Sequence, residues 1–391
     1  MLPHIITPPP GAQSRAMLER LAHAEAPSLT LPHGIVWAEA EGATITDVDG
    51  NRYLDLTSAF GVAGVGHRNP RVVAAVHDQA NLLLHGMGDV YAHESRVALV
   101  EAIAHVAPMP DARVYLAGGG AEAVEIALKT AVLATGKSGI VAFTGGYHGL
   151  TLGALAPTSR AAFRDPFLNL ISPNVIRAPY PYSYRQGDDC LEMSLDETER
   201  LIKTAAFPIG ALIVEPIQGR EGEIVPPAGW LAEIRRLCDQ HGILLIADEI
   251  FTGWGRTGRW WGVEHDSVVP DLICMGKGMT GGVQIAACVG RADLMEHWRV
   301  QGEPLHTATF MGHPLGCAGA LAAIKELQER NLVERCAELG NYTLNRLRTF
   351  AHDVPHIGDV RGRGLMIGIE LVTDRISKTP DPERALATVY A

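Results

Sequence analysis

The sequence predicts an α/β protein whose larger part is a mostly parallel β-sheet flanked by helices. From about residue 70 to about residue 300, short apolar runs alternate with helical patterns, as they do in parallel sheets with crossover helices. After about residue 300 the pattern changes to long helices and one strand pair, which predicts a smaller α+β part. A chain of 391 residues with 47% hydrophobic residues is sufficient for a large buried core.

The predicted elements follow one another along the chain. Residues 14–25 carry a short helical pattern, and two β-rich runs at 42–48 and 52–56 flank Asp49-Gly50-Asn51, a turn signal typical of a hairpin. Further helical patterns occupy residues 71–84, 121–135, 229–242, 314–330 and 332–351. Apolar strand patterns occupy residues 113–117, 139–143, 211–216, 243–249, 271–276 and 286–290, and a strand pair is predicted around 363–372.

Charge, hydropathy and cysteine content argue against several classes of protein. A net charge of −11 without any basic cluster argues against binding to nucleic acid or to an anionic membrane surface. No apolar run reaches the ~18 residues of a membrane span, and the N-terminus lacks the pattern of a secretory signal. The six cysteines are scattered, which favours reduced, buried thiols and a cytoplasmic location; they are Cys190, Cys238, Cys274, Cys288, Cys317 and Cys336.

The first candidate for a binding function is the glycine run Gly118-Gly119-Gly120, which follows a predicted strand and opens a predicted helix. Backbone N–H groups at such a helix start can hold a phosphate, and glycine allows the ligand to approach closely. A tight packing turn would have the same sequence. The run matches neither the dinucleotide-binding pattern nor the P-loop pattern.

The second candidate is the carboxylate pair Asp248-Glu249 at the C-terminal end of an apolar strand. Ligands of open α/β sheets bind at that end of the strands. A carboxylate there is costly unless a cation or a strong donor meets it. The alternative is that the aspartate caps the turn that follows.

The third candidate is Lys277, in the stretch LICMGKGMTGG at 272–282. It follows a buried strand, has glycine on both sides and has no carboxylate after it, whereas Lys129 has Glu125 four residues earlier and is predicted to form a solvated pair. Burial lowers the pKa of an amine, and a neutral lysine forms Schiff bases with carbonyls. A lysine that merely extends from a strand end to solvent is the alternative.

Taken together, the three candidates indicate one cofactor. A phosphate cradle, an acid at a strand end and a desolvated lysine are what pyridoxal 5′-phosphate (PLP) requires: the lysine holds its aldehyde, and the acid keeps its pyridine nitrogen protonated.

Six motifs, in the expected order between about residues 30 and 372, resemble those of class III (omega-type, subgroup II) aminotransferases of PLP fold type I. They are GYHGLT at 146–151, EPIQG at 215–219, DEIFTGWGRTG at 248–258, GKG at 276–278, TFMGHP at 309–314 and VRGRGLMIGIEL at 360–371. The resemblance implies a large domain with a mostly parallel seven-stranded sheet, and a smaller α+β domain. It places an N-terminal segment of the small domain at 1–60, the large PLP-binding domain at 61–300 and a C-terminal small domain, shorter than is usual in the family, at 301–391.

The resemblance also implies roles for individual residues. Lys277 would form the aldimine with PLP and then carry the proton between substrate and cofactor carbons, and Asp248 would bind the pyridine nitrogen. Tyr147 would stack on one ring face and Ile250 would pack on the other. Glycines 276 and 278 would leave room for the ring. The remaining implied cofactor-binding residues are Gly119, Gly120, Ala121, His148 (mainly structural) and Glu215, with Thr309 reaching the phosphate of the neighbouring subunit in a homodimer; no metal is implied.

The substrate side departs from the family pattern. Arg361 resembles the family's arginine for the substrate carboxylate, but the glutamate that gates it in ornithine- and GABA-type members is replaced by Arg220. Leu150 stands where several members have arginine, and Phe251 replaces a frequent glutamine. Two alternatives follow: either Arg361 stays available to a carboxylate, or Arg220 pairs with an acidic group, from Glu221 or from the substrate.

The sequence therefore predicts a PLP-dependent aminotransferase that moves an amino group from an amine or amino acid to a 2-oxo acid, pyruvate or 2-oxoglutarate, by a ping-pong mechanism. The alternatives are a decarboxylase similar to dialkylglycine decarboxylase, since IGDVRGRGL at 357–365 resembles its motif, an amino-acid racemase, and a degenerate, non-enzymatic binding protein.

Overall fold

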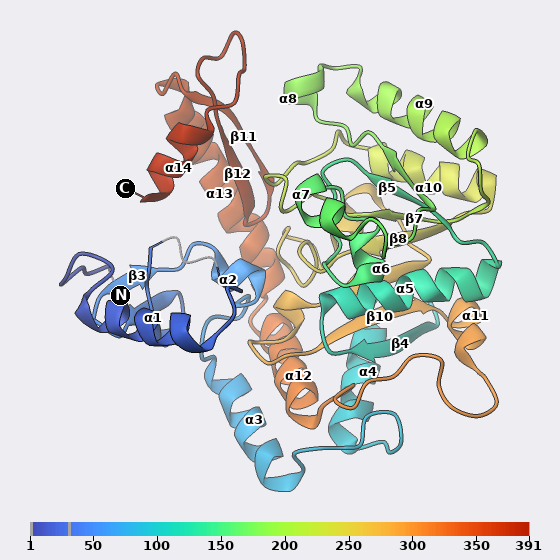
Figure 1. Ribbon diagram of the computed structural model, residues 1–391, viewed down its shortest axis with the longest axis horizontal. Coiled ribbons are helices and arrows are strands. Elements are labelled where there is room, and N and C mark those ends of the chain that lie inside the picture. The colour runs from blue at the N-terminus through green and yellow to red at the C-terminus, as the bar shows by residue number, and fades with distance from the viewer. Residues whose placement is uncertain (1–2, 30–32, 391) are drawn as a thin grey trace.

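The computed structural model describes residues 3–29 and 33–390 of the chain (Figure 1). Its centre is a seven-stranded sheet in the order β4-β10-β9-β8-β7-β5-β6. Neighbouring strands from β9 to β6 are parallel, and β10 runs antiparallel to both β9 and β4. The predicted mostly parallel sheet is thus confirmed. Its strands are β4 (Ala112–Ala117), β5 (Gly139–Phe143), β6 (Val175–Ala178), β7 (Ile209–Val214), β8 (Leu244–Asp248), β9 (Leu272–Met275) and β10 (Ala286–Arg291).

Both faces are covered at the centre of this sheet, so its central strands β7 and β9 carry no charged side chain. Every residue of β7 and of β9 is buried. Side chains alternate between the two faces: Ile213 and Cys274 belong to the core beneath α5 (Gly120–Thr135), whereas Leu212 and Ile273 belong to the larger core on the other face. That larger core also receives α4 (Glu94–Val106) and α10 (Trp230–His241).

The other helices connect these strands or pack beside the sheet. Neither β6 nor the long helices α4 and α9 have a counterpart among the predicted elements, while α3, α5, α10, α12 and α13 match predicted helices. The remaining α-helices of the described residues are α1 (Ala12–Ala24), α2 (Ser58–Gly61), α3 (Pro70–Leu82), α6 (Leu152–Leu155), α7 (Ala161–Arg164), α8 (Ser183–Gln186), α9 (Cys190–Lys203), α11 (Ala292–Met295), α12 (Pro314–Glu329), α13 (Leu332–His352) and α14 (Pro382–Tyr390).

The two ends of the chain form smaller units. A three-stranded antiparallel sheet contains β1 (Trp37–Glu41), β2 (Thr44–Asp47) and β3 (Arg52–Leu54), and the predicted hairpin is its β2–β3 pair. Near the C-terminus, β11 (Ile357–Arg363) and β12 (Met366–Leu371) form a two-stranded sheet on which α13 packs. Both units lie to the left of the large sheet in Figure 1. The domain boundaries at residues 60 and 300 remain predictions.

Three further expectations concern side chains and membrane spans. All six cysteines are free and buried, as predicted. The predicted Glu125–Lys129 pair is wrong, because Glu125 accepts hydrogen bonds from Thr151 Oγ1 at 2.7 Å and Gly153 N at 2.8 Å, while Lys129 Nζ lies 3.0 Å from His306 Nδ1. Within residues 3–29 and 33–390, no helix is long and apolar enough to cross a membrane.

Candidate active site

Six strands of the large sheet, all except β10, end at the same edge, and five of them end at or shortly before a candidate residue. Strands β5, β7, β8 and β9 are parallel, and β4 has their direction because two antiparallel pairings through β10 separate it from β9. Gly120 follows β4, Tyr147 follows β5, Glu215 follows β7, Asp248 ends β8 and Lys277 follows β9. This edge is where open α/β sheets bind their ligands.

A cavity of about 270 Å³ lies at this edge. It is lined by ten residues singled out in the sequence, which are Gly120, Ala121, Tyr147, His148, Leu150, Glu215, Arg220, Asp248, Ile250 and Lys277. Phe251, noted only as a departure from the family, and Gly149 and Gly219, which were not singled out, also line it. Gly119, Thr309 and Arg361 are not among the lining residues.

Lys277 occupies the position that its sequence context predicts. Its backbone has a φ of +43°, in the left-handed region, which costs a non-glycine residue about 1–2 kcal/mol. The Nζ atom lies 3.9 Å from the centre of the Phe251 ring. Burial lowers the pKa of Lys277 to about 8, although Asp248 and Glu215 act in the opposite direction; the positive charge of Arg220 lowers it further. The amine therefore loses its proton far more readily than an exposed lysine does.

Asp248 is oriented by a buried histidine. Because side chains alternate along β8, Asp248 continues the face that includes Ile246 and α5. Its Oδ2 atom lies 2.8 Å from Nδ1 of His148, and its Oδ1 atom accepts a hydrogen bond from Ile250 N at 3.2 Å. Both side chains are buried. His148 therefore orients this carboxylate.

The neighbouring Glu249 has a different environment. It is fully buried and accepts hydrogen bonds from the Gly262 and Val263 backbone N–H groups, each at 2.8 Å, and from the Thr252 hydroxyl. Burial raises its pKa to about 7. Of the two adjacent carboxylates, Glu249 thus holds the following loop in place, and Asp248 faces the cavity.

Tyr147 and Glu215 are joined through the backbone. Glu215 Oε1 accepts a hydrogen bond from Tyr147 N at 2.8 Å, and its Oε2 accepts one from Gly219 N at 3.1 Å. Burial raises the pKa of Glu215 to about 7. The guanidinium carbon of Arg220 lies 4.6 Å from the centre of the Tyr147 ring. Glu215 thus fixes the loop that carries the aromatic ring, and Arg220 stacks against that ring.

The start of α5 carries backbone N–H groups that could hold a phosphate. Gly119 is its N-cap residue, so Gly120 and Ala121 begin the helix with unpaired N–H groups. A Cβ atom on Gly120 would lie 3.0 Å from Ile250 Cδ1, and one on Gly149 would lie 2.7 Å from Ala121 Cβ. Glycine at these two positions lets the chain approach the helix start closely.

Arg361 lies on β11 and is engaged by other parts of the protein. Its Nη1 atom lies 2.9 Å from Glu370 Oε2 and donates to Tyr182 Oη at 2.7 Å, and its Nε donates to Gly222 O at 2.9 Å. Only 9% of its surface is exposed. These contacts join the C-terminal strand pair to the loop that follows β7.

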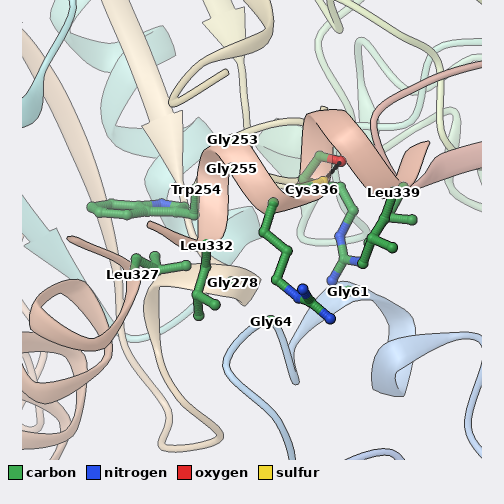
Figure 2. Close-up of a pocket in the computed structure, with 13 residues that line it drawn as sticks. Gly61, Gly64, Gly253, Trp254, Gly255, Gly278, Leu327, Leu332, Cys336 and Leu339 are labelled. Atoms are coloured by element: carbon green, nitrogen blue, oxygen red, sulfur yellow. Dashed lines mark hydrogen bonds between the residues drawn. The ribbon is translucent and has the colours of Figure 1, made fainter. Parts of the chain in front are cut away.

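A second cavity, of about 160 Å³, is lined by the 253–256 loop, the first turns of α13 and Gly278 (Figure 2). Trp254, Leu327 and Leu332 point into it, and Gly278 forms part of its wall. A Cβ atom on Gly278 would lie 3.2 Å from Trp254 Cβ, on the side of this second cavity. The expectation that Gly278 leaves room for the cofactor ring is therefore not what the geometry shows. Instead, Gly278 permits close packing against Trp254.

The residues around the first cavity fit PLP. The free N–H groups of α5 suit its phosphate, the Asp248 carboxylate suits its pyridine nitrogen, and the lysine suits its aldehyde. Tyr147 and Ile250 line the same cavity and offer an aromatic and an aliphatic surface for the ring. The chemistry of this donor set therefore matches the phosphate, the pyridine nitrogen and the aldehyde of the cofactor.

Comparisons with known proteins agree with this geometry. The model of the family "Aminotransferase class-III" matches residues 26–388. An acetylornithine aminotransferase of Methanopyrus kandleri is 39% identical over 86% of this chain and 81% of its own length. An alanine/serine racemase of Pyrococcus horikoshii is 33% identical over 97% of this chain and 82% of its own length. A PLP-bound amine transaminase from an uncultivated Pseudomonas species superposes with a TM-score of 0.85 at 32% identity, over 92% of this chain and 85% of its own.

Proposed function

This chain belongs to the class-III aminotransferase family, whose members use PLP and include transaminases, and on that premise we propose its reaction and the roles of its residues. The donor is an amine or an ω-amino acid, and the acceptor is a 2-oxo acid, pyruvate or 2-oxoglutarate, in a ping-pong sequence. The observation that carries this proposal is the buried Lys277 amine, with a pKa of about 8, in one cavity with Asp248.

Each residue of the cavity has a distinct task in this proposal. PLP, when bound, supplies an electron sink for the bonds at the substrate carbon. Asp248 holds a proton on the pyridine nitrogen, and His148 keeps the carboxylate in position from 2.8 Å. Gly119, Gly120 and Ala121 bind the phosphate through the helix start, and Tyr147 and Ile250 enclose the ring. Lys277 would take the proton from the substrate carbon as a general base and deliver it to the cofactor carbon as a general acid.

The proposed active unit is a homodimer in which Thr309 contacts the phosphate in the neighbouring subunit. Thr309 is exposed and lies outside the cavity of its own chain. Its surroundings are an apolar surface: the neighbouring Phe310 is 65% exposed with its ring 5.3 Å from the His85 ring, and Met87, 53% exposed, precedes Gly88, on which a Cβ atom would lie 3.0 Å from Thr309 O. Exposed apolar surface of this kind marks an interaction site. A cytoplasmic location and the domain division at residues 60 and 300 complete the proposal.

A racemase is the second candidate, because the Pyrococcus horikoshii relative is an alanine/serine racemase. The two reactions differ in what they consume. A transaminase requires a 2-oxo acid for continued turnover, whereas a racemase inverts an amino acid without one. A decarboxylating variant of the reaction would release carbon dioxide.

The test is to incubate the PLP-loaded protein with a panel of amines and amino acids, with and without pyruvate or 2-oxoglutarate. Chromatography then detects a new amino acid, polarimetry detects inversion, and a gas electrode detects carbon dioxide. The proposal requires a new amino acid that appears only when a 2-oxo acid is present. Lys277→Ala should abolish continued turnover, and a Lys277→Ala protein that keeps turning over would overturn the mechanism.

A further inference from the structure

We infer that Arg220, rather than Arg361, binds the carboxylate of the substrate at the opening of the cavity. This inference rests on the proposed function, because it assumes that the cavity beside Lys277 is where substrates bind. It assigns the specificity for carboxylate-bearing amines and 2-oxo acids to one side chain that replaces the family's gating glutamate.

Arg220 is available for a ligand. Its side chain is exposed and lines the same cavity as Lys277. Among residues 3–29 and 33–390, no carboxylate oxygen lies within 4.0 Å of its guanidinium nitrogens. Its guanidinium carbon lies 4.6 Å from the centre of the Tyr147 ring and 5.5 Å from the centre of the Phe163 ring. Stacking on two aromatic rings orients the planar guanidinium and leaves its N–H edge free to form a bidentate pair with a carboxylate.

The adjacent Glu221 does not satisfy this arginine. The positive charge that acts on Glu221 is that of Arg160, which opposes the rise in the Glu221 pKa caused by burial. Its Cγ atom packs over the Gly145 backbone, where a Cβ atom would lie only 2.9 Å away. The sequence left open whether Arg220 pairs with Glu221 or with the substrate, and the geometry favours the substrate.

Arg361 is in the opposite situation. Two acidic side chains, Glu370 at 2.9 Å and Asp359 at 3.3 Å, already balance its charge, and the Gly222 carbonyl and the Tyr182 hydroxyl take its remaining donors. To receive a substrate, a guanidinium that is 9% exposed would have to break these bonds and leave two carboxylates unpaired. Its role is that of a positioning residue, which holds the loop bearing Arg220 through the Gly222 carbonyl.

The electrostatic effect of Arg220 reaches the reacting amine. Its charge contributes to the lowered pKa of Lys277, which places the guanidinium within effective electrostatic range of that side chain. A carboxylate bound to Arg220 would cancel part of this charge. Substrates with a carboxylate therefore gain a charge-assisted contact that simple amines of the same length do not make.

The test compares 4-aminobutyrate with butylamine as donors and uses butyrate as a probe that cannot react. In the PLP-loaded protein, Arg220→Leu should weaken butyrate binding about 10- to 100-fold by calorimetry, the size expected for a lost charge-assisted hydrogen bond. The ratio of kcat/KM for 4-aminobutyrate to that for butylamine should fall by a similar factor. Arg220→Lys should restore part of both, because it keeps the charge without the bidentate geometry.

Arg160→Leu is the matched control, since Arg160 also stacks on Phe163, at 5.6 Å, but does not line the cavity. Unchanged butyrate binding in Arg220→Leu, equal losses for both donors, or a larger loss of butyrate binding in Arg361→Lys than in Arg220→Leu would each overturn the inference. A wild-type protein that transfers no amino group but binds butyrate through Arg220 would refute the proposed function alone.

Discussion

At the scale of single residues, Asp248 and Glu249 show how one strand end supplies both a reactive carboxylate and a structural one. The alternation of side chains along β8 sends them to opposite faces of the sheet, where Asp248 meets His148 and Glu249 meets two backbone N–H groups. We therefore expect that replacing the carboxylate by an amide mainly lowers stability at Glu249 and mainly lowers kcat at Asp248. Glu249→Gln should lower the free energy of unfolding by about 1–3 kcal/mol, because an amide cannot accept all of these hydrogen bonds.

Asp248→Asn should lower the free energy of unfolding by less than Glu249→Gln does, because a neutral His148 ring can accept a hydrogen bond from the new amide. It should reduce kcat by roughly 100-fold or more, because a neutral side chain no longer keeps the pyridine nitrogen protonated. Urea denaturation and steady-state kinetics on both variants check the pair, each variant serving as the control for the other. A large loss of stability in Asp248→Asn with unimpaired kcat would mean that Asp248 is a structural carboxylate and not the reactive one.

Lys277 makes the stability of the cofactor-free protein depend on pH. Its pKa is about 8 in the folded chain and 10.5 when unperturbed, so between these values the unfolded chain holds a proton that the folded chain has released. The free energy of unfolding should therefore rise with pH across this window. The total change is about 3 kcal/mol for a shift of this size. Below pH 8 both states are protonated, and the penalty for the buried charge is fully present.

Lys277→Met should remove that penalty and stabilise the cofactor-free protein at pH 7 by up to about 3 kcal/mol, an advantage that disappears near pH 10.5. Urea denaturation at pH 7, 8, 9 and 10 measures it, with Lys129→Met as the control for an exposed lysine. Parallel pH profiles for wild type and Lys277→Met would mean that the lysine is not desolvated in solution.

At the scale of elements, the sequence pattern is most informative where elements are long and buried on both faces. The strands β7, β8 and β9 and the helices α5, α10, α12 and α13 all have predicted counterparts. The four-residue edge strand β6 does not, because its sequence VIRA contains an arginine and is only partly buried, whereas the equally short β9, LICM, is an uninterrupted apolar run. The candidate residues lie at the C-terminal ends of strands that run in the same direction. The alternation of strands and helices that predicts the sheet therefore also predicts that most cavity residues lie close together.

What the sequence could not supply is the direction of side chains that depend on distant partners. Arg361 and Arg220 were equally plausible carboxylate-binding residues. Only the pairing of β11 with β12 brings Glu370 opposite Asp359 and so beside Arg361. Likewise, the i,i+4 spacing of Glu125 and Lys129 predicted a pair that is replaced by contacts of Glu125 with the start of α6 and of Lys129 with His306.

The turn at α2 stores backbone strain beside the cavity. Ser58, Ala59 and Phe60 have φ values of +51°, +48° and +56°, and the next residue, Gly61, packs against Phe251 and the Lys277 side chain. Left-handed backbone costs a non-glycine residue about 1–2 kcal/mol. Glycine relieves this cost but makes the unfolded chain more flexible, at a penalty of about 0.4–1 kcal/mol.

Ala59→Gly should therefore raise the free energy of unfolding by roughly 0.5–1 kcal/mol. Ala63→Gly is the control, because Ala63 has no positive φ and should only lose stability. Urea denaturation of the cofactor-free protein measures both. A loss of stability in Ala59→Gly equal to that of Ala63→Gly would show that the turn does not hold this strained conformation in solution.

At the scale of the whole molecule, the proposed site is complete only when two chains meet. The cavity of one chain supplies Lys277 and Asp248, whereas Thr309 is exposed on an apolar surface outside it. A pair of variants with defects in different parts of a shared site can therefore complement each other. Lys277→Ala removes the amine, and Thr309→Asp places a negative charge where the partner's phosphate would bind, which weakens cofactor binding by like-charge repulsion.

When the two inactive variants are unfolded together, mixed and refolded with PLP, half of the dimers are mixed and each contains one intact site. Activity should therefore recover to about a quarter of the wild-type value for a two-fold symmetric dimer. Mixing Lys277→Ala with Asp248→Asn is the matched control, since both residues belong to the same chain's cavity and no intact site can form. Recovery in the control as well, or in neither mixture, would contradict a phosphate contact by Thr309 across the interface.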